Sequence, residues 1–277
     1  MKKHLPKIIA LLSSFAPSLA AKIALKMFAT PTRIPRPESE MAVYGTSKKY
    51  LLSNGIAAFE WGNPTDPLVM LIHGWNGRGT QIGAFSTRLV ELGFRVVALD
   101  GPGHGISPDG PNGMTNPGHY AQFITLAQKE LDPNGAHAVI AHSFGGGCSV
   151  LAAKRGFKVK GMVLVGTPNF YERVVTFFGK SFGLNDKGLE HFFALVTKVA
   201  GLKPSELITG EIGNTLNLPC LVVHDKDDNA VAIAAGESIH QQWKGSKILK
   251  TEGLGHRRIL KDPQVIAEVC DFIKSIP

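Results

Sequence analysis

The sequence predicts an α/β protein built on a doubly wound, mostly parallel sheet. Short, unbroken apolar runs recur from residue 49 onward, and such runs are typical of strands that are buried on both faces. Helical stretches separate these runs, and this alternation favours a parallel sheet with helices on both faces. The chain has 277 residues, of which 44% are hydrophobic, so it can form one large domain, or at most two, with a packed core.

The predicted elements follow one another at short intervals. Asn54-Gly55 is a two-residue hairpin signal between strands at 49–52 and 56–61. Gly93 ends a helical stretch over 81–92, because glycine readily closes a helix. The remaining strands are predicted at 68–72, 95–99, 138–141, 161–165, 220–223 and 247–250. The remaining helices are predicted at 120–131, 144–155, 230–243 and 263–276.

The net charge of +8 belongs to the beginning of the chain. Residues 1–37 hold seven basic residues and no acidic one. The other 240 residues carry 23 basic residues against 22 acidic ones, so their charge is nearly balanced. Nucleic-acid binding through the folded body, which needs a basic surface, is therefore not expected.

Residues 1–28 are predicted to form a basic, amphipathic arm. Its apolar side chains recur at three- and four-residue steps, which places them on one helical stripe. They are Leu5, Ile8, Ile9, Leu12, Phe15, Leu19, Ile23 and Met27. Pro17 interrupts or kinks this helix. Such an arm docks on the domain or makes peripheral contact with an anionic membrane. A proline-rich, extended linker follows over 30–40, so residues 1–40 precede a domain over 41–277.

The same segment also fits a secretory signal. Three lysines precede an uncharged segment over 8–21, and Ser18-Leu19-Ala20 offers a small-x-small cleavage site. Two serines and a proline dilute that segment, and the helical pattern continues to Met27, which favours a retained arm. We therefore expect a cytoplasmic protein that the arm can attach to a membrane, with export through the signal as the alternative.

The cysteines and the glycine-rich loop over 100–107 point to structural roles. Cys148, Cys220 and Cys270 lie far apart in apolar stretches, so we expect buried thiols and no disulfide framework. The loop lacks both glycine-rich nucleotide motifs and is predicted to be a structural turn. The histidines and acidic residues show no metal-ligand spacing. No uncharged apolar run reaches the roughly 18 residues of a spanning helix. We expect no metal and no cofactor.

Ala-His-Ser-Phe-Gly at 141–145 joins a predicted strand directly to a predicted helix. On so tight a turn, a serine projects its hydroxyl above the sheet edge, and small residues two positions away on each side relieve crowding. The helix N-terminus behind Ser143 also favours developing negative charge. The sequence therefore predicts Ser143 as a nucleophile. The alternative is an ordinary strand–turn–helix junction with a chance serine.

His-Gly-Trp at 73–75 follows an earlier buried strand. Gly74 allows a close backbone approach, so the N–H of Trp75 can point into the space above Ser143. Together with the N–H of Phe144 it would form an oxyanion hole, a pair of donors for a tetrahedral alkoxide. The alternative is a structural turn in which Trp75 only packs. His73 is predicted to brace this loop.

Three aspartates follow the strand at 220–223 and compete for one role. An acid in this loop can orient an imidazole and stabilise its cation. We favour Asp228, and we expect Asp225 to shape the turn and Asp227 to be solvated. His256 stands behind two glycines after the last strand and is the expected base. The other histidine that follows the acid, His240, lies in a predicted helix. The order serine, aspartate, histidine is typical of hydrolases of this architecture.

These motifs together resemble the α/β-hydrolase fold superfamily, in particular its small serine esterase and lipase-like branch. The resemblance runs from about residue 50 to 277, without the segment that follows the predicted strand at 161–165. It rests on H-G-W, D-G-P-G-H-G-I-S, A-H-S-F-G-G, H-D-K-D-D-N-A-V and G-L-G-H. It implies a Ser143 nucleophile, an Asp228 acid and a His256 base, with oxyanion donors at Trp75 and Phe144. A serine nucleophile argues against the dehalogenase and epoxide-hydrolase branches, which use aspartate.

The segment over 167–216 looks like the family's helical cap insertion, because a single helix between two strands would need far fewer residues. It is rich in phenylalanine, and an apolar cap over Ser143 would favour acyl or alkyl groups. The aromatic residues expected to line a substrate pocket are Phe170, Phe177, Phe178, Phe192 and Phe193. The alternative is that these rings only hold the cap's own helices together.

The predicted function is hydrolysis of a small carboxylic ester through an acyl-enzyme. Acyl transfer or peptide hydrolysis by the same three residues is one alternative. A ligand-binding protein on a hydrolase scaffold is another, although such a scaffold has no need to keep all five functional positions. The sequence does not indicate an oligomeric state.

Overall fold

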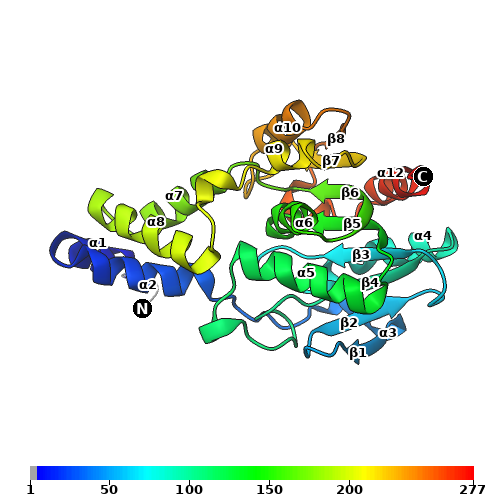
Figure 1. The fold of residues 1–277 in the computed structure, drawn as a ribbon, viewed down its shortest axis with the longest axis horizontal. Coiled ribbons are helices and arrows are strands. Elements are labelled where there is room, and N and C mark those ends of the chain that lie inside the picture. Colours follow the sequence, from blue (N-terminus) through cyan, green and yellow to red (C-terminus); the bar gives the residue numbers. More distant parts are fainter. Residues whose placement is uncertain (1–4) are drawn as a thin grey trace.

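The computed structural model describes residues 5–277. Eight strands form one sheet in the order β1-β2-β4-β3-β5-β6-β7-β8. The strands from β3 to β8 are parallel, and β2 runs antiparallel to β1 and β4. Helices lie on both faces of this sheet (Figure 1). The predicted α/β fold class, with its doubly wound and mostly parallel sheet, is confirmed.

The central strands are fully buried because their apolar runs face helices on both sides. All predicted strands are present, with small shifts at their ends. Their bounds are β1 Lys48–Leu51, β2 Ala57–Trp61, β3 Leu68–Ile72, β4 Arg95–Leu99, β5 Ala136–His142, β6 Val159–Val165, β7 Cys220–Asp225 and β8 Lys247–Thr251.

The helices connect these strands or precede them. The α-helices are α1 Leu5–Phe15, α2 Pro17–Ala29, α3 Met41–Thr46, α4 Ser86–Glu91, α5 Pro117–Leu131, α6 Phe144–Lys154, α7 Tyr171–Ser181, α8 Asp186–Ala200, α9 Thr209–Asn214, α10 Ile233–Gln242, α11 Gly255–Arg258 and α12 Pro263–Lys274. The 3₁₀ helices are η1 Glu38–Glu40, η2 Gly79–Phe85, η3 Pro111–Gly113 and η4 Pro204–Glu206.

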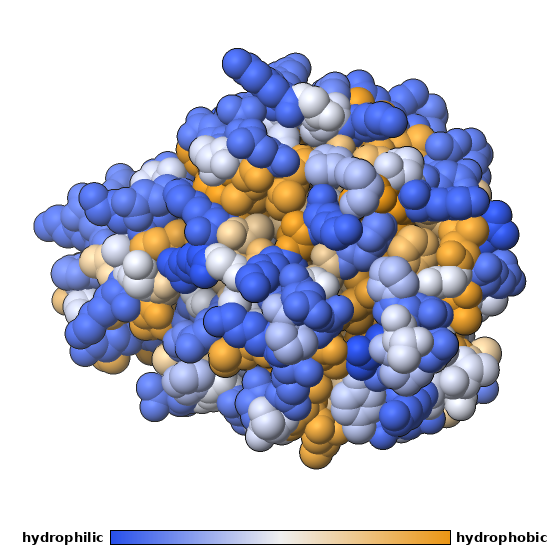
Figure 2. Space-filling model, turned by 45° about the vertical axis from the view of Figure 1, so that its right-hand side comes forward, coloured by the Kyte–Doolittle hydropathy of each residue, from blue (hydrophilic) through white to orange (hydrophobic). Residues whose placement is uncertain are grey.

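The two faces of the sheet bury separate hydrophobic clusters. One cluster holds side chains of α5, α6, α9 and α10, including the buried rings of Tyr120 and Trp243. The other holds side chains of η2, α4 and α12, including Phe85 and Val269. In Figure 2, polar residues cover most of the visible surface, and hydrophobic residues show mainly in the gaps between them.

Two predicted helices differ from the observed ones. The stretch predicted as one helix over 81–92 is the 3₁₀ helix η2 followed by the short α4. Its start is fixed from outside, because the buried Asp100 carboxylate accepts a hydrogen bond from the Gly79 N–H at 2.7 Å. The helix predicted from residue 230 begins at Ile233 instead. The N–H groups of Ala230 and Val231 donate to Asp228, which holds them outside the helix.

The arm and the cap insertion pack together as a helical lobe. Helices α1, α2, α7 and α8 lie at one end of the molecule, beside the sheet domain (Figure 1). The main contact joins α2 to α8, and its core includes Ala20, Ala24, Phe192 and Val196. Alanines on α2 let the two helices approach closely. Pro17 starts α2, so the predicted interruption of the arm helix is observed.

The predicted single apolar stripe of the arm is divided between two faces. Ile9 is buried against the lobe, whereas Ile8, Phe15, Leu19 and Ile23 are exposed. Lys2 and Lys3 lie outside the described residues. Among residues 5–277, no helix combines the length and the hydrophobicity that crossing a bilayer requires.

Polar contacts fix the arm and the linker in place. The buried Ser13 hydroxyl donates to the side chain of Asn185 at 2.8 Å, and the Asn185 amide donates back to the Ser13 carbonyl at 3.1 Å. The linker predicted over 30–40 has no regular structure over residues 31–37, but its last three residues form the 3₁₀ helix η1, and the linker is tied to the domain. The Arg33 guanidinium donates to the carbonyls of Gly105 at 2.6 Å and Ser107 at 2.8 Å.

A glycine in α9 allows a buried contact that can be tested. A Cβ at Gly213 would overlap the ring of Trp243, which is only 1% exposed and has no room to move. We expect Gly213→Ala to lower the free energy of unfolding by about 1–3 kcal/mol, measured by urea denaturation. Gly45→Ala in α3 is the matched control, because a Cβ there meets nothing within 4 Å. Equal stability of the two variants would contradict this packing.

Candidate active site

Ser143 lies on a strained turn between β5 and α6. Its φ of 53° and ψ of −123° are unusual for a residue with a side chain. Close neighbours must be small: a Cβ at Gly74 would lie 2.8 Å from the Ser143 Cβ, and a Cβ at Gly145 would overlap the His73 carbonyl oxygen. The Ser143 N–H donates to the Val165 carbonyl at 2.8 Å, which anchors the turn to β6. The backbone therefore holds the hydroxyl at the carboxyl edge of the sheet.

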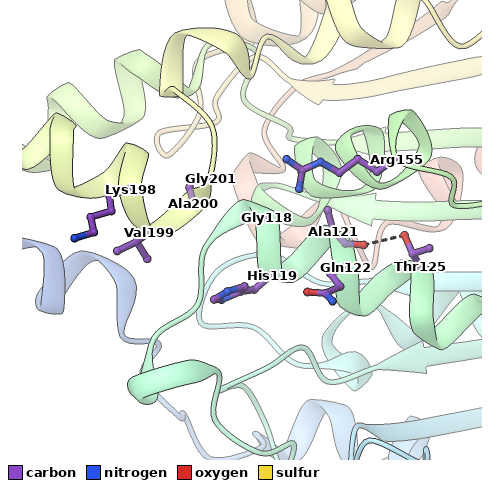
Figure 3. Close-up of a pocket in the computed structure, with 10 residues that line it drawn as sticks. All are labelled: Gly118, His119, Ala121, Gln122, Thr125, Arg155, Lys198, Val199, Ala200 and Gly201. Atoms are coloured by element: carbon purple, nitrogen blue, oxygen red, sulfur yellow. Dashed lines mark hydrogen bonds between the residues drawn. The ribbon is translucent and has the colours of Figure 1, made fainter.

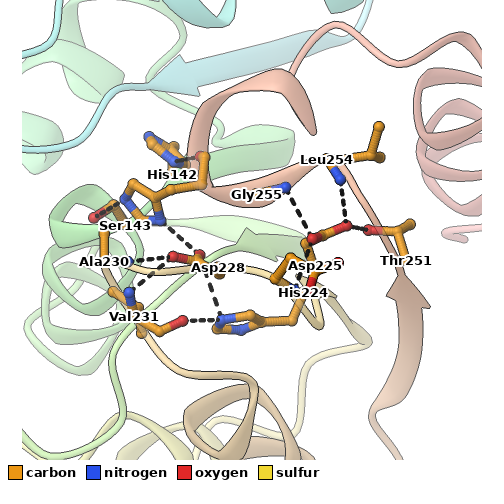
Figure 4. Close-up of polar contacts among 12 residues, drawn as sticks. His142, Ser143, His224, Asp225, Asp228, Ala230, Val231, Thr251, Leu254 and Gly255 are labelled. Carbon is orange, nitrogen blue, oxygen red and sulfur yellow. Dashed lines mark hydrogen bonds and ion pairs between the residues drawn. The ribbon is translucent and has the colours of Figure 1, made fainter.

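His256 lies beside this hydroxyl, on the short helix α11 that follows β8. Its Nε2 is 3.0 Å from the Ser143 Oγ, and its Nδ1 is 2.7 Å from an Asp228 carboxylate oxygen. Figure 4 shows these contacts as one continuous chain. Gly166 leaves room for them, because a Cβ there would lie 3.2 Å from the His256 Nδ1. The structure thus brings together the three predicted side chains, from three loops at the same sheet edge.

Asp228 is buried and fully hydrogen-bonded. One carboxylate oxygen accepts the N–H groups of Ala230 and Val231, each at 2.8 Å, and the other faces His256. Burial by itself raises the pKa of the Asp228 carboxyl, but the hydrogen bonds from His256 and Val231 outweigh it, so the pKa is lowered. The group is therefore ionised at neutral pH and held in one orientation.

The other two aspartates have separate positions. Asp225 accepts the N–H groups of Asp227, Leu254 and Gly255 and the hydroxyl of Thr251. Asp225 was predicted to shape its own turn. It also shapes the loop that carries His256, because it binds the N–H groups of Leu254 and Gly255. Asp227 is exposed and accepts only the Gly253 N–H, at 2.8 Å. Neither carboxylate faces the His256 ring.

Two histidines complete the site, and the sequence reasoning missed both. His142 precedes Ser143, and its Nε2–H donates to the His256 carbonyl at 2.9 Å while the two rings lie 4.6 Å apart. Burial lowers the pKa of His142 to about 3, so its ring is neutral. The buried His224 Nε2–H donates to the Val231 carbonyl at 2.8 Å and lies 3.6 Å from Asp228. The only signal in the sequence was their position beside the predicted nucleophile and acid.

The two expected oxyanion donors flank the serine. Phe144 is the first residue of α6, so its N–H has no acceptor within the helix. Within residues 5–277, the N–H of Trp75 donates no hydrogen bond. The Trp75 and Phe144 rings meet edge to face, with 5.2 Å between their centroids. Both N–H groups are thus free to donate a hydrogen bond to a ligand's oxygen.

The motifs around this site have structural roles. The His73 Nδ1–H donates to the Gly74 carbonyl at 2.7 Å, and its Nε2 accepts the Gly101 N–H at 2.9 Å. His73 thus joins its own loop to the glycine-rich loop over 100–107. That second loop is closed by Asp100, which also accepts the Ile106 N–H at 2.9 Å. Among residues 5–277 there is no group of three or more His, Cys, Asp or Glu residues that could hold a metal ion.

The cap phenylalanines lie mainly in the packing of the lobe, which corrects the expected pocket lining. Phe178 and Phe192 contact the Phe28 ring of α2, at 5.3 and 5.6 Å between centroids. Phe192 is fully buried there, and Phe177 is 68% exposed on the lobe surface. Their apolar character could not reveal that the arm, rather than a ligand, would cover them.

The other two expected rings also face parts of the lobe. The Arg173 guanidinium lies over the Phe170 ring at 4.6 Å, and Phe193 borders an open recess beside Lys203 and Pro204. An aromatic contact that the sequence reasoning did not single out lies closer to the nucleophile. The Tyr171 hydroxyl donates to the Phe144 carbonyl at 3.1 Å, and the Phe144 ring packs on Tyr120.

A separate surface cavity lies between α5 and the end of α8. It encloses about 500 Å³, and its lining includes His119, Gln122, Arg155 and Lys198. Figure 3 shows Arg155 and Lys198 on opposite sides, with side chains that do not point toward each other. The cavity therefore lacks the convergent polar groups of a binding site, and its lining does not include Ser143, His256 or Asp228.

A family model of the alpha/beta hydrolase fold matches residues 67–185, the part that carries β3 to β6 and the serine turn. The chain has the α/β-hydrolase fold, and solved structures of a putative lipase and a thioesterase domain share it at 17% identity. Among similar proteins is a putative non-heme haloperoxidase of Mycobacterium phage D29, which is 38% identical over 102 residues, covering 36% of this chain and 35% of that protein. An esterase of Mycobacterium tuberculosis is 33% identical over 141 residues, covering 50% of this chain and 43% of that protein.

The curated relatives of this α/β hydrolase match over less than half of their own length, from 28% to 43%. A solved structure of a membrane phospholipase A aligns with the whole of this chain and 99% of its own, with a TM-score of 0.67 and 17% identity. At that identity the likeness extends to the fold alone.

Proposed function

We propose that this α/β hydrolase is a serine hydrolase that cleaves carboxylic esters through an acyl-enzyme. The observation that carries the proposal is the unbroken chain from the Ser143 hydroxyl through His256 to Asp228, with contacts of 3.0 and 2.7 Å. A histidine placed between a hydroxyl and a carboxylate activates the hydroxyl as a nucleophile. Several relatives are named as esterases, which supports the same reaction class.

The reaction begins when the His256 Nε2 takes the proton of the Ser143 hydroxyl as the Oγ attacks the ester carbonyl carbon. The tetrahedral alkoxide collapses, the bond to the alcohol oxygen breaks, and His256 returns the proton to that oxygen. A water then attacks the acyl-serine and loses a proton to His256. The second tetrahedral intermediate collapses, the bond from the acyl carbon to the Ser143 Oγ breaks, His256 returns the proton to that Oγ, and the carboxylic acid leaves. Each step moves one proton through the same Nε2.

Asp228 stabilises the imidazolium that forms in each step. Its carboxylate is ionised and held by two backbone N–H groups, so it receives the His256 Nδ1–H without reorganising. His142 holds the other side, since it binds the backbone carbonyl of His256. Its ring stays neutral, so it adds no positive charge that would oppose the imidazolium.

The N–H groups of Trp75 and Phe144 are proposed to stabilise the alkoxide. Phe144 follows the nucleophile, Trp75 follows Gly74, which lies against Ser143, and neither N–H donates a hydrogen bond among residues 5–277. The half-buried rings of Trp75 and Phe144, which pack edge to face, belong to the same two residues, so we propose apolar acyl or alkyl esters as substrates.

The test combines a p-nitrophenyl ester series of increasing acyl length with labelling by a fluorophosphonate. We expect turnover of the esters and one label per chain, located on Ser143 by mass spectrometry of peptides. Turnover with the label on another residue would overturn the assignment. Ligand-dependent stabilisation with neither turnover nor labelling would indicate a binding protein on a hydrolase scaffold.

The acyl acceptor is tested separately. Adding alcohols or amines to the acyl-enzyme should leave the free acid as the main product, because the proposal assigns water as the second substrate. Ester or amide as the main product would instead show an acyltransferase. Cleavage of peptides in preference to esters would show a peptidase.

A further inference from the structure

The arm carries a second apolar surface in addition to the one that it buries. Ile8, Leu11, Phe15, Leu19 and Ile23 are between 36% and 81% exposed, and together they define what we call the outer face. They account for five of the eleven large exposed hydrophobic residues among residues 5–277. The inner side of the same helices is already covered by α8, so packing of the lobe does not explain the outer face.

The outer face combines one side of each arm helix. Ile8, Leu11 and Phe15 are spaced by three and four residues, so they share one side of α1. Leu19 and Ile23 are four residues apart and share one side of α2, which packs against α1. The junction between α1 and α2 lies at the end of the lobe farthest from the sheet (Figure 1). Phe15, beside it, is 81% exposed, so the apolar surface protrudes from the molecule.

The positive charge of the arm favours an anionic partner for the outer face. Lys7, Lys22 and Lys26 are exposed on the same two helices, and no acidic residue occurs before Glu38. A second copy seated symmetrically on the outer face would bring these lysines together without an acidic partner from the arm. An anionic bilayer instead offers phosphates for the lysines and acyl chains for the apolar residues.

We propose that the outer face docks the helical lobe on the surface of an anionic bilayer. The apolar side chains enter the boundary between headgroups and acyl chains, and the lysines remain at the level of the phosphates. The inner contacts of α2 with α8 hold the two helices in place, so the face is already formed before it meets the membrane. Docking does not depend on the proposed ester hydrolysis.

The test is co-sedimentation of the full-length protein with vesicles. One set contains only phosphatidylcholine, and a second also contains phosphatidylglycerol. We expect at least about tenfold tighter binding to the anionic vesicles. Added salt should weaken this binding, because it screens the attraction between the lysines and the lipid phosphates. Equal binding to both sets, or no binding to either, would overturn the proposal.

Variants distinguish docking through the outer face from nonspecific adsorption to the vesicles. Leu11→Ser combined with Phe15→Ser should weaken binding by about tenfold or more, because less apolar area enters the bilayer. Lys22→Gln combined with Lys26→Gln should weaken it and reduce the salt dependence. Leu126→Ser on α5 removes a 46% exposed apolar side chain elsewhere and should bind like the unaltered protein.

Two further readouts keep the result unambiguous. The substituted side chains are exposed, so the urea midpoint of each variant should equal that of the unaltered protein. Sedimentation equilibrium without lipid should show one chain per particle. A dimer that dissociates when Leu11→Ser and Phe15→Ser are introduced would show that the outer face binds a second copy of the chain and not a membrane.

Discussion

Replacing Ser143 with alanine is expected to lower kcat for p-nitrophenyl esters by on the order of 10⁶. The Ser143 hydroxyl is the only one that contacts the His256 Nε2 among residues 5–277, so its loss removes the attacking atom itself. Binding and the oxyanion donors remain, so slow residual hydrolysis is expected to persist. Initial rates at saturating substrate give kcat directly.

Ser149→Ala is the matched control, because Ser149 lies on α6, the helix that follows Ser143, and its hydroxyl donates to the Gly145 carbonyl at 2.8 Å. It should leave kcat within a few-fold of the unaltered value. Comparable rates for Ser143→Ala and the unaltered protein would show that another nucleophile acts.

The same assay distinguishes Asp228 from Asp227. Asp228→Asn should lower kcat by about 10⁴, since an amide cannot stabilise the imidazolium and disturbs the His256 tautomer. Asp227→Asn should change kcat little, because its carboxylate contacts only the Gly253 N–H. A larger loss for Asp227→Asn than for Asp228→Asn would contradict the assignment of the acid.

The protein is expected to lose stability steeply as the pH falls from about 6 to 5. Burial lowers the pKa of His73 to about 4 and those of His104 and His142 to about 3. The unfolded chain takes up protons on these rings near their ordinary pKa of about 6.5, whereas the folded chain does not. Each ring then costs about 1.4 kcal/mol of folding free energy per pH unit until its folded pKa is reached. Asp100, whose pKa burial raises, contributes in the opposite direction once the pH falls through its folded pKa.

Urea unfolding at several pH values measures this slope, and a variant assigns it. His104→Asn should reduce the slope by about 1.4 kcal/mol per pH unit, because one buried imidazole is absent from the proton balance. His191→Asn should leave the slope unchanged, because His191 is exposed on α8. A slope that is the same for the unaltered protein and for His104→Asn would contradict a neutral, buried His104.

The sheet and the hydrogen-bonded residues Ser143, His256 and Asp228 were predictable because their sequence signals are local. Each buried strand is an apolar run, and the turn at Ser143 needs small residues at fixed offsets, both of which can be recognised over a few positions. The choice among the three aspartates was also predicted, and the structure places Asp228 alone against His256.

The contacts that the sequence did not reveal join residues far apart in the chain. His142 binds the carbonyl of His256, which lies 114 positions away, and no local pattern encodes that pairing. The arm shows the same limit in another form. Its apolar residues repeat at helical steps on two sides, so the spacing alone could not show that Ile9 turns inward and Ile8 outward.

Three passages of the chain, rather than two, connect the lobe to the sheet domain. A cap insertion has two hinges and can swing open like a lid, but here the linker adds a third attachment that Arg33 ties to the glycine-rich loop. A hinged opening of the lobe would have to break the hydrogen bonds of the Arg33 guanidinium or separate α2 from α8. Entry to Ser143 is therefore expected to depend on small sliding movements between helices, with the lobe as a whole staying in place.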